Sequence, residues 1–253
     1  MKRVDVRRAG RTLLNALYPA RANCMGCASP IGADEGWLCD ECRALLRPVR
    51  SLSTPRCMRC GCPSRPGKPC ALCGDWNAQA PDFARYAYFY VRPVERVVRQ
   101  MKYAGVACLG DWMAQQIYAM IQNEHFPEFA LIVPVPMHDK RLRERGRNHA
   151  SVIAHALGRL CGLPCEEALR RTRNTAQQAR LDGAQRRKNL TGAFQSRSRL
   201  DGKSVLLVDD VATTGATLLE CAAALREAGA ARVLAATLAG PDVLERRNYE
   251  EKA

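Results

Sequence analysis

After residue 80, the chain alternates short apolar runs with segments in which apolar residues recur at helical spacing. The run Phe83 to Val91 is rich in aromatic and β-branched residues, which favours a strand. Pro93 can open a helix, and the apolar positions from Val94 to Met101 keep a helical period until Gly105 ends the pattern. A second helix is expected from about Leu109 to Ile121.

The next apolar run, Ala130 to Val133, is short and continuous, as is typical of a strand buried on both faces, and it stops at Pro134. From there to Arg147 the sequence is basic, and we expect a loop. The later elements are expected as a helix through Ile153 to Leu160, a short strand near Leu163 to Leu169, an Arg-rich stretch without periodicity to Leu190, a strand from Ser204 to Val208, a helix from Ala216 to Ala228 and a last strand from Arg232 to Leu238. Strands that alternate with helices predict an α/β fold with a mainly parallel sheet, flanked by helices, which binds ligands at the carboxyl ends of its strands.

Length and composition narrow the class of protein. The 253 residues suffice for one large or two unequal domains, and 47% apolar with 25% charged residues is close to a globular average. No apolar run approaches the ~20 residues of a membrane-spanning helix. The first 20 residues are basic but hold no apolar run of ~7 residues and no clear cleavage site, so we predict a cytoplasmic protein without a signal peptide.

Cysteine is concentrated near the start, because nine of the 13 cysteines lie between Cys24 and Cys73. Disulfides rarely persist in a reducing cytosol, so dense cysteine there indicates metal binding. Two thiolates three residues apart on a tight turn reach one zinc ion, and a second such pair completes a tetrahedron. The four CxxC pairs therefore predict two structural zinc sites, with Cys24, Cys27, Cys39, Cys42, Cys57, Cys60, Cys70 and Cys73 as ligands.

Because the spacers are short, we expect the first pair to join the second and the third to join the fourth, with interleaving as the alternative. Cys62 could replace Cys60 as a ligand. A redox CxxC is the other interpretation, but that motif occurs singly in a βαβ context. Cys108, Cys161, Cys165 and Cys221 are expected to be buried thiols. The change in composition predicts two domains, an N-terminal helix with a double zinc ribbon over residues 1–80 and an α/β domain over residues 81–253.

The net charge is +14, and basic residues gather between Asp139 and Leu190, where 13 Lys or Arg face 5 acids for a local net of +8. Such a field attracts phosphates, whether of a small substrate or of nucleic acid. An ordinary solvated Arg-rich surface is the alternative.

The segment Val205 to Thr217 combines a buried strand, two acids at its carboxyl end, a run of small residues and a following helix. Backbone amides and the helix dipole favour a phosphate at such a helix start, and Gly215 allows close approach. Asp209 and Asp210 would repel a phosphate unless they bind something else. Hydrogen bonds from vicinal sugar hydroxyls fit them, so we expect a ligand similar to ribose 5-phosphate. A generic α/β turn with paired acids is the alternative.

This segment resembles the 5-phosphoribosyl-1-pyrophosphate (PRPP) motif of type I phosphoribosyltransferases. The resemblance implies that Asp209 and Asp210 contact the ribose hydroxyls. It also implies that the 5′-phosphate is held by Ala212, Thr213, Thr214, Gly215, Ala216 and Thr217.

Three further segments, Val133 to Ala150, Arg171 to Leu181 and Arg187 to Phe194, resemble the ComF family, whose members are linked to DNA uptake in natural transformation. The resemblance implies a pyrophosphate loop at Pro134 to Arg141 and a mobile hood from about Arg171 to Asn189. The usual Arg-Gly-Phe-Asn-Gln reads Arg-Gly-Arg-Asn-His at residues 145–149, so an apolar anchor and an amide are missing.

Phosphoribosyl transfer breaks the C1–O bond to pyrophosphate, so the charge that develops on the leaving group must be neutralised by Mg²⁺ and by cationic side chains. The candidates are Lys102, Lys140, Arg141, Arg145, Arg171 and Arg173, with Arg141 and Arg171 as catalytic choices beside the two aspartates. Lys102 could instead complement the end of its helix. His138 lies in the expected pyrophosphate loop and could contact the substrate there. An exposed neutral histidine is the equal alternative.

Two other functions stay open. The first is a module that binds single-stranded DNA through phosphates, with Trp76, Tyr86 or Tyr88 as stacking surfaces, and that works with DNA-uptake proteins. The second is a regulator that senses PRPP without turnover.

Overall fold

A computed structural model describes residues 23–32, 36–51, 53–64, 70, 72–103, 108–173 and 190–243. The expected N-terminal helix, Gly105 and most of the hood stretch lie outside these ranges. Within the described ranges, no helix combines the length and apolar character that crossing a membrane requires.

The main sheet has four parallel strands in the order β1, β6, β5, β2. Their bounds are β1 Phe83–Phe89, β2 Leu131–Pro134, β5 Ser204–Val211 and β6 Arg232–Gly240. The two central strands are almost continuously buried, which explains their uninterrupted apolar sequences. The parallel α/β sheet expected from the sequence is thus confirmed.

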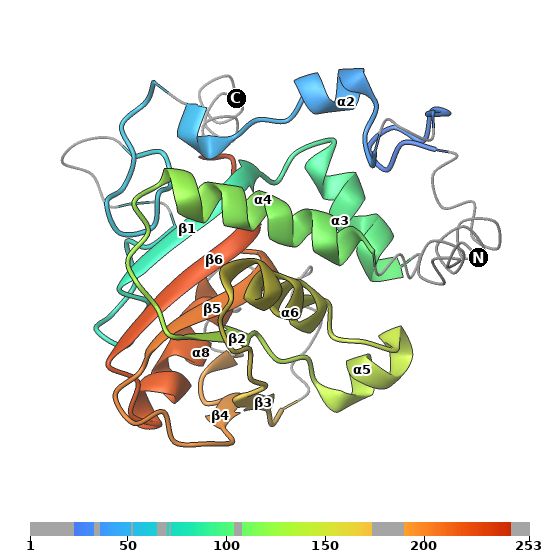
Figure 1. Ribbon diagram of the computed structural model, residues 1–253. Helices are drawn as coiled ribbons and strands as arrows, with labels where there is room; N and C mark the ends of the chain where they lie inside the picture. Colours follow the sequence, from blue (N-terminus) through green and yellow to red (C-terminus); the bar gives the residue numbers. More distant parts are fainter. Residues whose placement is uncertain are drawn as a thin grey trace, which may run out of the picture.

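Helices cover both faces of this sheet (Figure 1), with α3 Val94–Tyr103, α4 Leu109–Asn123 and α6 His149–Cys161 on one face and α8 Ala216–Glu227 on the other. Alternate side chains of β5 pack on opposite sides. Leu206 and Val208 join the core beneath α3, α4 and α6, whereas Val205 and Leu207 join the core beneath α8.

The loop expected between Pro134 and Arg147 is wrong in part, because α5 spans Asp139–Arg145. The helix has no buried residue, so it leaves no apolar period in the sequence. Its ends carry the local signals instead. His138 Nδ1 accepts a hydrogen bond from Lys140 N at 3.2 Å, and Gly146 closes the helix with a left-handed backbone.

The short strand expected near Leu163 to Leu169 is also displaced. Cys165 makes only an isolated parallel bridge to Ile132, and the strand β3 covers Leu169–Arg171. β3 pairs antiparallel with β4 Phe194–Ser196, a strand that the sequence did not reveal. Three-residue strands are too short for alternation to stand out.

The cysteine-rich segment contains α2 Asp40–Ala44 and the 3-10 turn η1 Val49–Ser51. Its buried residues belong to the cores of the α/β sheet. Cys60 and Cys73 lie in the core that contains β5 residues Val205 and Leu207, while Cys24 and Cys42 lie in the core beneath α3. The domain boundary near residue 80 stays a prediction, and the two segments share their hydrophobic cores.

Candidate functional site

The carboxyl end of β5 carries the acidic pair. Asp209 and Asp210 are the sixth and seventh residues of this strand, so they point to opposite faces of the sheet. Asp210 is 7% exposed, and its backbone N–H donates to Asp209 Oδ1 at 2.8 Å. The strand thus fixes both carboxylates at the edge where a parallel sheet binds ligands.

A loop of small residues follows and leads into α8. Gly215 is the N-cap of α8 and has a φ of +70°, a backbone conformation that residues other than glycine rarely adopt. No side chain caps the helix at this residue. Thr214 Oγ1 accepts a hydrogen bond from Ala216 N at 3.5 Å. The start of α8 therefore presents backbone amides beside a Thr-Gly turn, an arrangement suited to phosphate.

Lys102 lies in the last turn of α3 and reaches the acidic pair. Its Nζ is 2.9 Å from Asp210 Oδ1 and 2.8 Å from Asp210 Oδ2. The interpretation of Lys102 as a mere complement to its helix end is therefore wrong, because the ammonium binds a carboxylate of another element. This ion pair neutralises half of the acidic pair, and an anionic ligand meets less repulsion there.

The charges at this edge shift each other's ionisation. Burial, together with the neighbouring Asp210 carboxylate, raises the pKa of Asp209 to about 7. Burial lowers the pKa of Lys102, but the Asp210 and Asp209 carboxylates outweigh it and raise the pKa above its usual value. At neutral pH, Lys102 is charged and Asp209 is close to half ionised.

These groups open into a cavity of about 240 Å³. The predicted site residues that line it are Lys102, Arg141, Arg145, Arg171, Asp209, Asp210, Ala212, Thr213, Thr214, Gly215, Ala216 and Thr217. Lys140 and Arg173 are not among its described lining residues and are exposed. Arg173 instead donates to the Thr191 carbonyl. The cavity thus joins four cationic side chains, two carboxylates and the phosphate-type loop.

Tyr90, Asn148 and His149 also line the cavity, and sequence reasoning did not place them there. Asn148 Nδ2 donates to the Val135 carbonyl at 3.0 Å and so holds the turn before α6. His149 is 3% exposed, and burial lowers its pKa, so its ring is neutral. The signal for the last two was present, since both belong to the 145–149 segment that departs from the ComF pattern.

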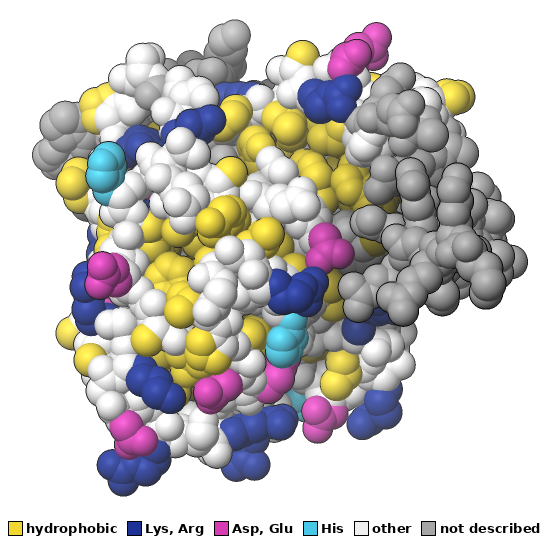
Figure 2. Space-filling view, in the orientation of Figure 1, with side chains coloured by type: hydrophobic (Ala, Val, Ile, Leu, Met, Phe, Trp, Pro, Cys, Tyr) yellow, Lys and Arg dark blue, Asp and Glu magenta, His cyan; other side chains and the backbone are white. Residues whose placement is uncertain are grey.

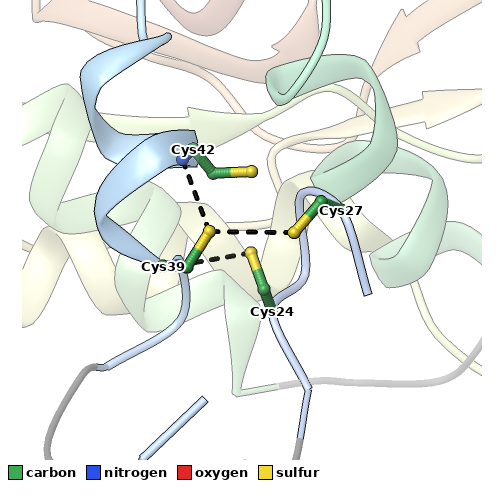
Figure 3. Close-up of side chains that lie close together, drawn as sticks. All are labelled: Cys24, Cys27, Cys39 and Cys42. Atoms are coloured by element: carbon green, nitrogen blue, oxygen red, sulfur yellow. Dashed lines mark hydrogen bonds between the residues drawn. The ribbon is translucent and has the colours of Figure 1, made fainter. Parts of the chain in front are cut away.

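The eight cysteines of the CxxC pairs form two clusters in the described residues, and the pairing is sequential. Cys24, Cys27, Cys39 and Cys42 converge from a turn and from the start of α2 (Figure 3). In each cluster, the ligand sulfurs lie within 4.8 Å of one another. The sulfurs of Cys27 and Cys39 are 3.7 Å apart.

The second cluster contains Cys57, Cys60, Cys70 and Cys73. Its sulfur pairs Cys57–Cys73 and Cys60–Cys70 are 3.5 Å and 3.4 Å apart. Four thiolates around zinc, at ~2.3 Å each, stand ~3.8 Å from one another, so both clusters fit the ion as structural sites. Cys62 is buried beside this cluster and is not one of its four members.

Two expectations about exposure are wrong. Cys108 is exposed rather than buried, because it precedes α4 at a turn. Tyr86 cannot stack on nucleic acid, since it is 3% exposed in the core. Of the proposed stacking residues, Trp76 and Tyr88 are half-buried, and Tyr88 donates its hydroxyl to Gln116 at 2.8 Å.

The exposed basic residues are mixed with acids. Figure 2 shows Lys and Arg side chains along the lower edge of that view, where Figure 1 places α5 and the β3–β4 sheet, with acidic side chains between them. The exposed members of this region include Arg143, Arg147, Arg170 and Arg197. The described part of the basic stretch therefore has exposed guanidinium groups on α5, after it and on β3.

Comparison with known proteins agrees with this geometry. Residues 13–78 match the family model of a double zinc ribbon domain, and residues 147–252 match that of a phosphoribosyl transferase domain. Fold and site thus define a phosphoribosyltransferase-type domain joined to a double zinc ribbon.

The chain belongs to the ComF family, because it matches DNA utilization and competence proteins over most of their length. The DNA utilization protein YhgH of Salmonella typhi is 30% identical over 217 residues, which are 83% of this chain and 93% of that protein. Competence protein F of Haemophilus influenzae is 28% identical over 81% of this chain and 91% of its own. Competence protein ComFC of Bacillus subtilis is 26% identical over 82% of this chain and 90% of its own.

Among solved structures, an adenine phosphoribosyltransferase from Thermoanaerobacter pseudethanolicus aligns with a TM-score of 0.38 and 15% identity. The alignment covers 68% of this chain and 87% of the other. The family assignment rests on the sequence matches.

Proposed function

We propose that this protein binds PRPP with Mg²⁺ in the β5–α8 cavity and transfers its phosphoribosyl group to an acceptor. One observation carries the proposal, namely that a single cavity holds an acidic pair, a Thr-Gly loop at a helix start and four cationic side chains. These are the groups that a ribose, a 5-phosphate and a pyrophosphate require.

Each part of the ligand has its own residues. The loop from Ala212 to Thr217 binds the 5′-phosphate through backbone amides and threonine hydroxyls. The ionised Asp209 carboxylate accepts hydrogen bonds from the ribose hydroxyls, as does Asp210 with the oxygen lone pairs that Lys102 leaves. Arg141 and Arg171, from α5 and β3, face the pyrophosphate.

In the reaction, the C1–O bond breaks and pyrophosphate leaves, a bond from C1 to the acceptor forms, and the acceptor's proton passes to water. When bound with PRPP, Mg²⁺ would supply positive charge at the pyrophosphate. Arg141, Arg145 and Arg171, on α5 and β3, line the same cavity and stabilise the same leaving group with their positive charges. The dense metal-ligand cysteines suit a reducing compartment, so we place the protein in the cytoplasm.

The test is calorimetric titration of the zinc-loaded protein with PRPP and Mg²⁺, followed by an assay for pyrophosphate release with candidate bases. Saturable Mg²⁺-dependent binding supports the proposal. Absence of binding would reject it, and binding without pyrophosphate release from any base would favour the PRPP sensor.

Binding of single-stranded DNA is a second candidate function, with two observations in its favour. Relatives covering most of the chain are named for competence and DNA utilization. The stretch from Asp139 to Leu190 also carries a local net charge of +8. Phosphate contacts in this stretch and partnership with DNA-uptake proteins would place the protein beside the incoming strand.

A further inference from the structure

Trp76, three residues after the last ligand of the second cysteine cluster, lies against the phosphate-type loop. A Cβ added at Gly215 would stand 2.6 Å from indole Cζ2, 2.7 Å from Nε1 and 2.9 Å from Cε2. The indole edge therefore packs on the glycine backbone itself. Trp76 is not among the described residues that line the cavity, so its ring lies on the side of the loop away from the cavity.

The second cluster holds this indole in place. Trp76 N donates to the Cys73 carbonyl at 3.1 Å. Arg59, between the ligands Cys57 and Cys60, donates to the Trp76 carbonyl at 3.4 Å, and its guanidinium lies 5.5 Å from the indole centroid. Two segments that carry cysteines of the cluster therefore contact Trp76, one through its backbone and the other through its backbone and its ring.

The cluster is in turn fixed to the sheet at β1. Arg59 accepts a hydrogen bond from Ala84 N at 2.7 Å, and Arg85 Nη2 donates to the Met58 carbonyl at 3.2 Å. Arg85 also binds Glu124 at the end of α4. A rigid path thus runs from the sheet through the cluster to the loop.

We infer that Trp76 is a positioning residue, which makes the second metal cluster a support for the loop that binds the phosphate monoester of the ligand. This inference rests on the proposed function. Gly215 has a left-handed backbone without a side-chain cap, so packing must select its conformation. When the cluster loses its metal, the indole loses its anchor and the loop populates other conformations. Affinity for the ligand then falls in proportion to the fraction of molecules in which the loop is still organised.

The first cluster offers a matched contrast. A Cβ at its Gly26 would meet Cys42 and Pro93, and Arg96 of α3 donates to the Cys27 carbonyl at 3.2 Å. Its buried cysteines belong to the core on the other face of the sheet. Its metal therefore supports α3, which carries Lys102, and does not support the Gly215 loop.

The main experiment compares Trp76→Ala and Trp76→Phe with Trp112→Ala, a half-buried tryptophan on α4 in the opposite core. Titration with ribose 5-phosphate, and with PRPP and Mg²⁺, measures the dissociation constants. For Trp76→Ala we expect both constants to rise about tenfold, as when one molecule in ten keeps the loop organised. Trp76→Phe should restore most of the affinity, and Trp112→Ala should keep it. Unchanged affinity in Trp76→Ala overturns the inference, whereas a wild-type protein that binds neither ligand rejects the proposed function instead.

A second measurement does not depend on any ligand. Gly215→Ala forces a methyl group onto the indole in the wild type, but in a Trp76→Ala background only the backbone strain at φ +70° remains. The melting temperature should therefore fall less in that background. Equal losses in both backgrounds would show that the two residues do not touch.

Cysteine variants test the role of the metal directly. With zinc content measured in parallel, Cys57→Ser should weaken the binding of inorganic phosphate, which reports on the loop alone. Cys27→Ser in the first cluster, on the side of α3 and Lys102, should leave phosphate binding nearly unchanged. Equal effects of the two variants would overturn the assignment of the second cluster to the loop.

Discussion

Lys102 and Asp210 are 108 residues apart in the sequence, and the Lys102 ammonium lies 2.8 to 2.9 Å from both Asp210 carboxylate oxygens. The pair joins the end of α3 to the end of β5 at the mouth of the cavity. It places a positive charge beside the acidic pair, in the cavity proposed to bind an anion. The ion pair thus belongs both to the stability of the fold and to the proposed binding of PRPP.

Replacement of Lys102 by Met should destabilise the protein by about 3 kcal/mol, because it leaves Asp210 buried without its cation. Chemical unfolding measures this loss. The double variant Lys102→Met with Asp210→Asn should regain most of the stability, since no uncompensated charge remains, but should still bind PRPP weakly. A double variant as unstable as Lys102→Met would show that the ion pair is not the cause.

PRPP affinity should rise with pH through about 7, because the pKa of Asp209 is raised to about 7 and its ionised form accepts hydrogen bonds from ribose. Titrations at pH 6 and 8 measure this change. The ligand phosphates also titrate near pH 6, so Asp209→Asn serves as the control and should flatten the part of the profile that the protein contributes.

The ionisation of Asp209 should lower the stability of the fold as the pH rises, although it raises the affinity for PRPP. Its folded pKa lies above the unfolded value, so the folded state binds more protons between about pH 4 and 7, and stability falls as pH rises through that window. Asp209→Asn should therefore raise the melting temperature at pH 8 while it weakens PRPP binding. A variant that melts lower than the wild type at pH 8 would contradict the raised pKa.

The phosphate loop should be sensitive to its hydroxyl donors. Thr214→Val keeps the volume but loses the hydroxyl that holds the turn and faces the cavity. We expect ribose 5-phosphate and PRPP to lose affinity alike, by about 1.5–3 kcal/mol or roughly ten- to a hundredfold. In contrast, Asp210→Asn should weaken ligands with a ribose and leave inorganic phosphate nearly unaffected.

Metal analysis should find two zinc ions per chain, since each cluster has four sulfurs at tetrahedral separations. Because Cys60 and Cys73 share a core with β5, loss of the second zinc should destabilise the α/β sheet as well as the ribbon. Thermal unfolding after treatment with a chelator measures this. If the protein stays folded without metal and its melting temperature does not change, the zinc ions are not structural.

If the basic stretch binds single-stranded DNA, the affinity for DNA should fall as the salt concentration rises. The logarithm of the binding constant, plotted against the logarithm of the salt concentration, should have a slope near −0.7 per phosphate contacted. Replacing Arg186, Arg187 and Lys188 together by Ala should reduce both the affinity and the slope. These three residues lie outside the described ranges, so their effect is expected from their charge. A flat salt response would argue against a DNA surface.

The sequence by itself determined the features that depend on neighbours along the chain. The spacing of the CxxC pairs predicted two metal clusters, since a turn of four residues brings two sulfurs together whatever the rest of the fold does. The strand, acidic pair, Thr-Gly turn and helix of residues 205–217 likewise form one local unit, and the structure shows that unit as β5, the loop and α8.

The tertiary structure alone decided which distant residues meet this unit. Lys102 looked like the basic end of an amphipathic helix, and only the packing of α3 beside β5 places it on Asp210. Nothing in the sequence around Trp76 indicated a contact with Gly215, and only the docking of the second cluster on β1 brings the two residues together. The helix α5 was missed because none of its residues is buried, so its sequence has no apolar period. Contacts between separated elements depend on how the layers pack, and an apolar pattern records only that a residue is buried, not against what.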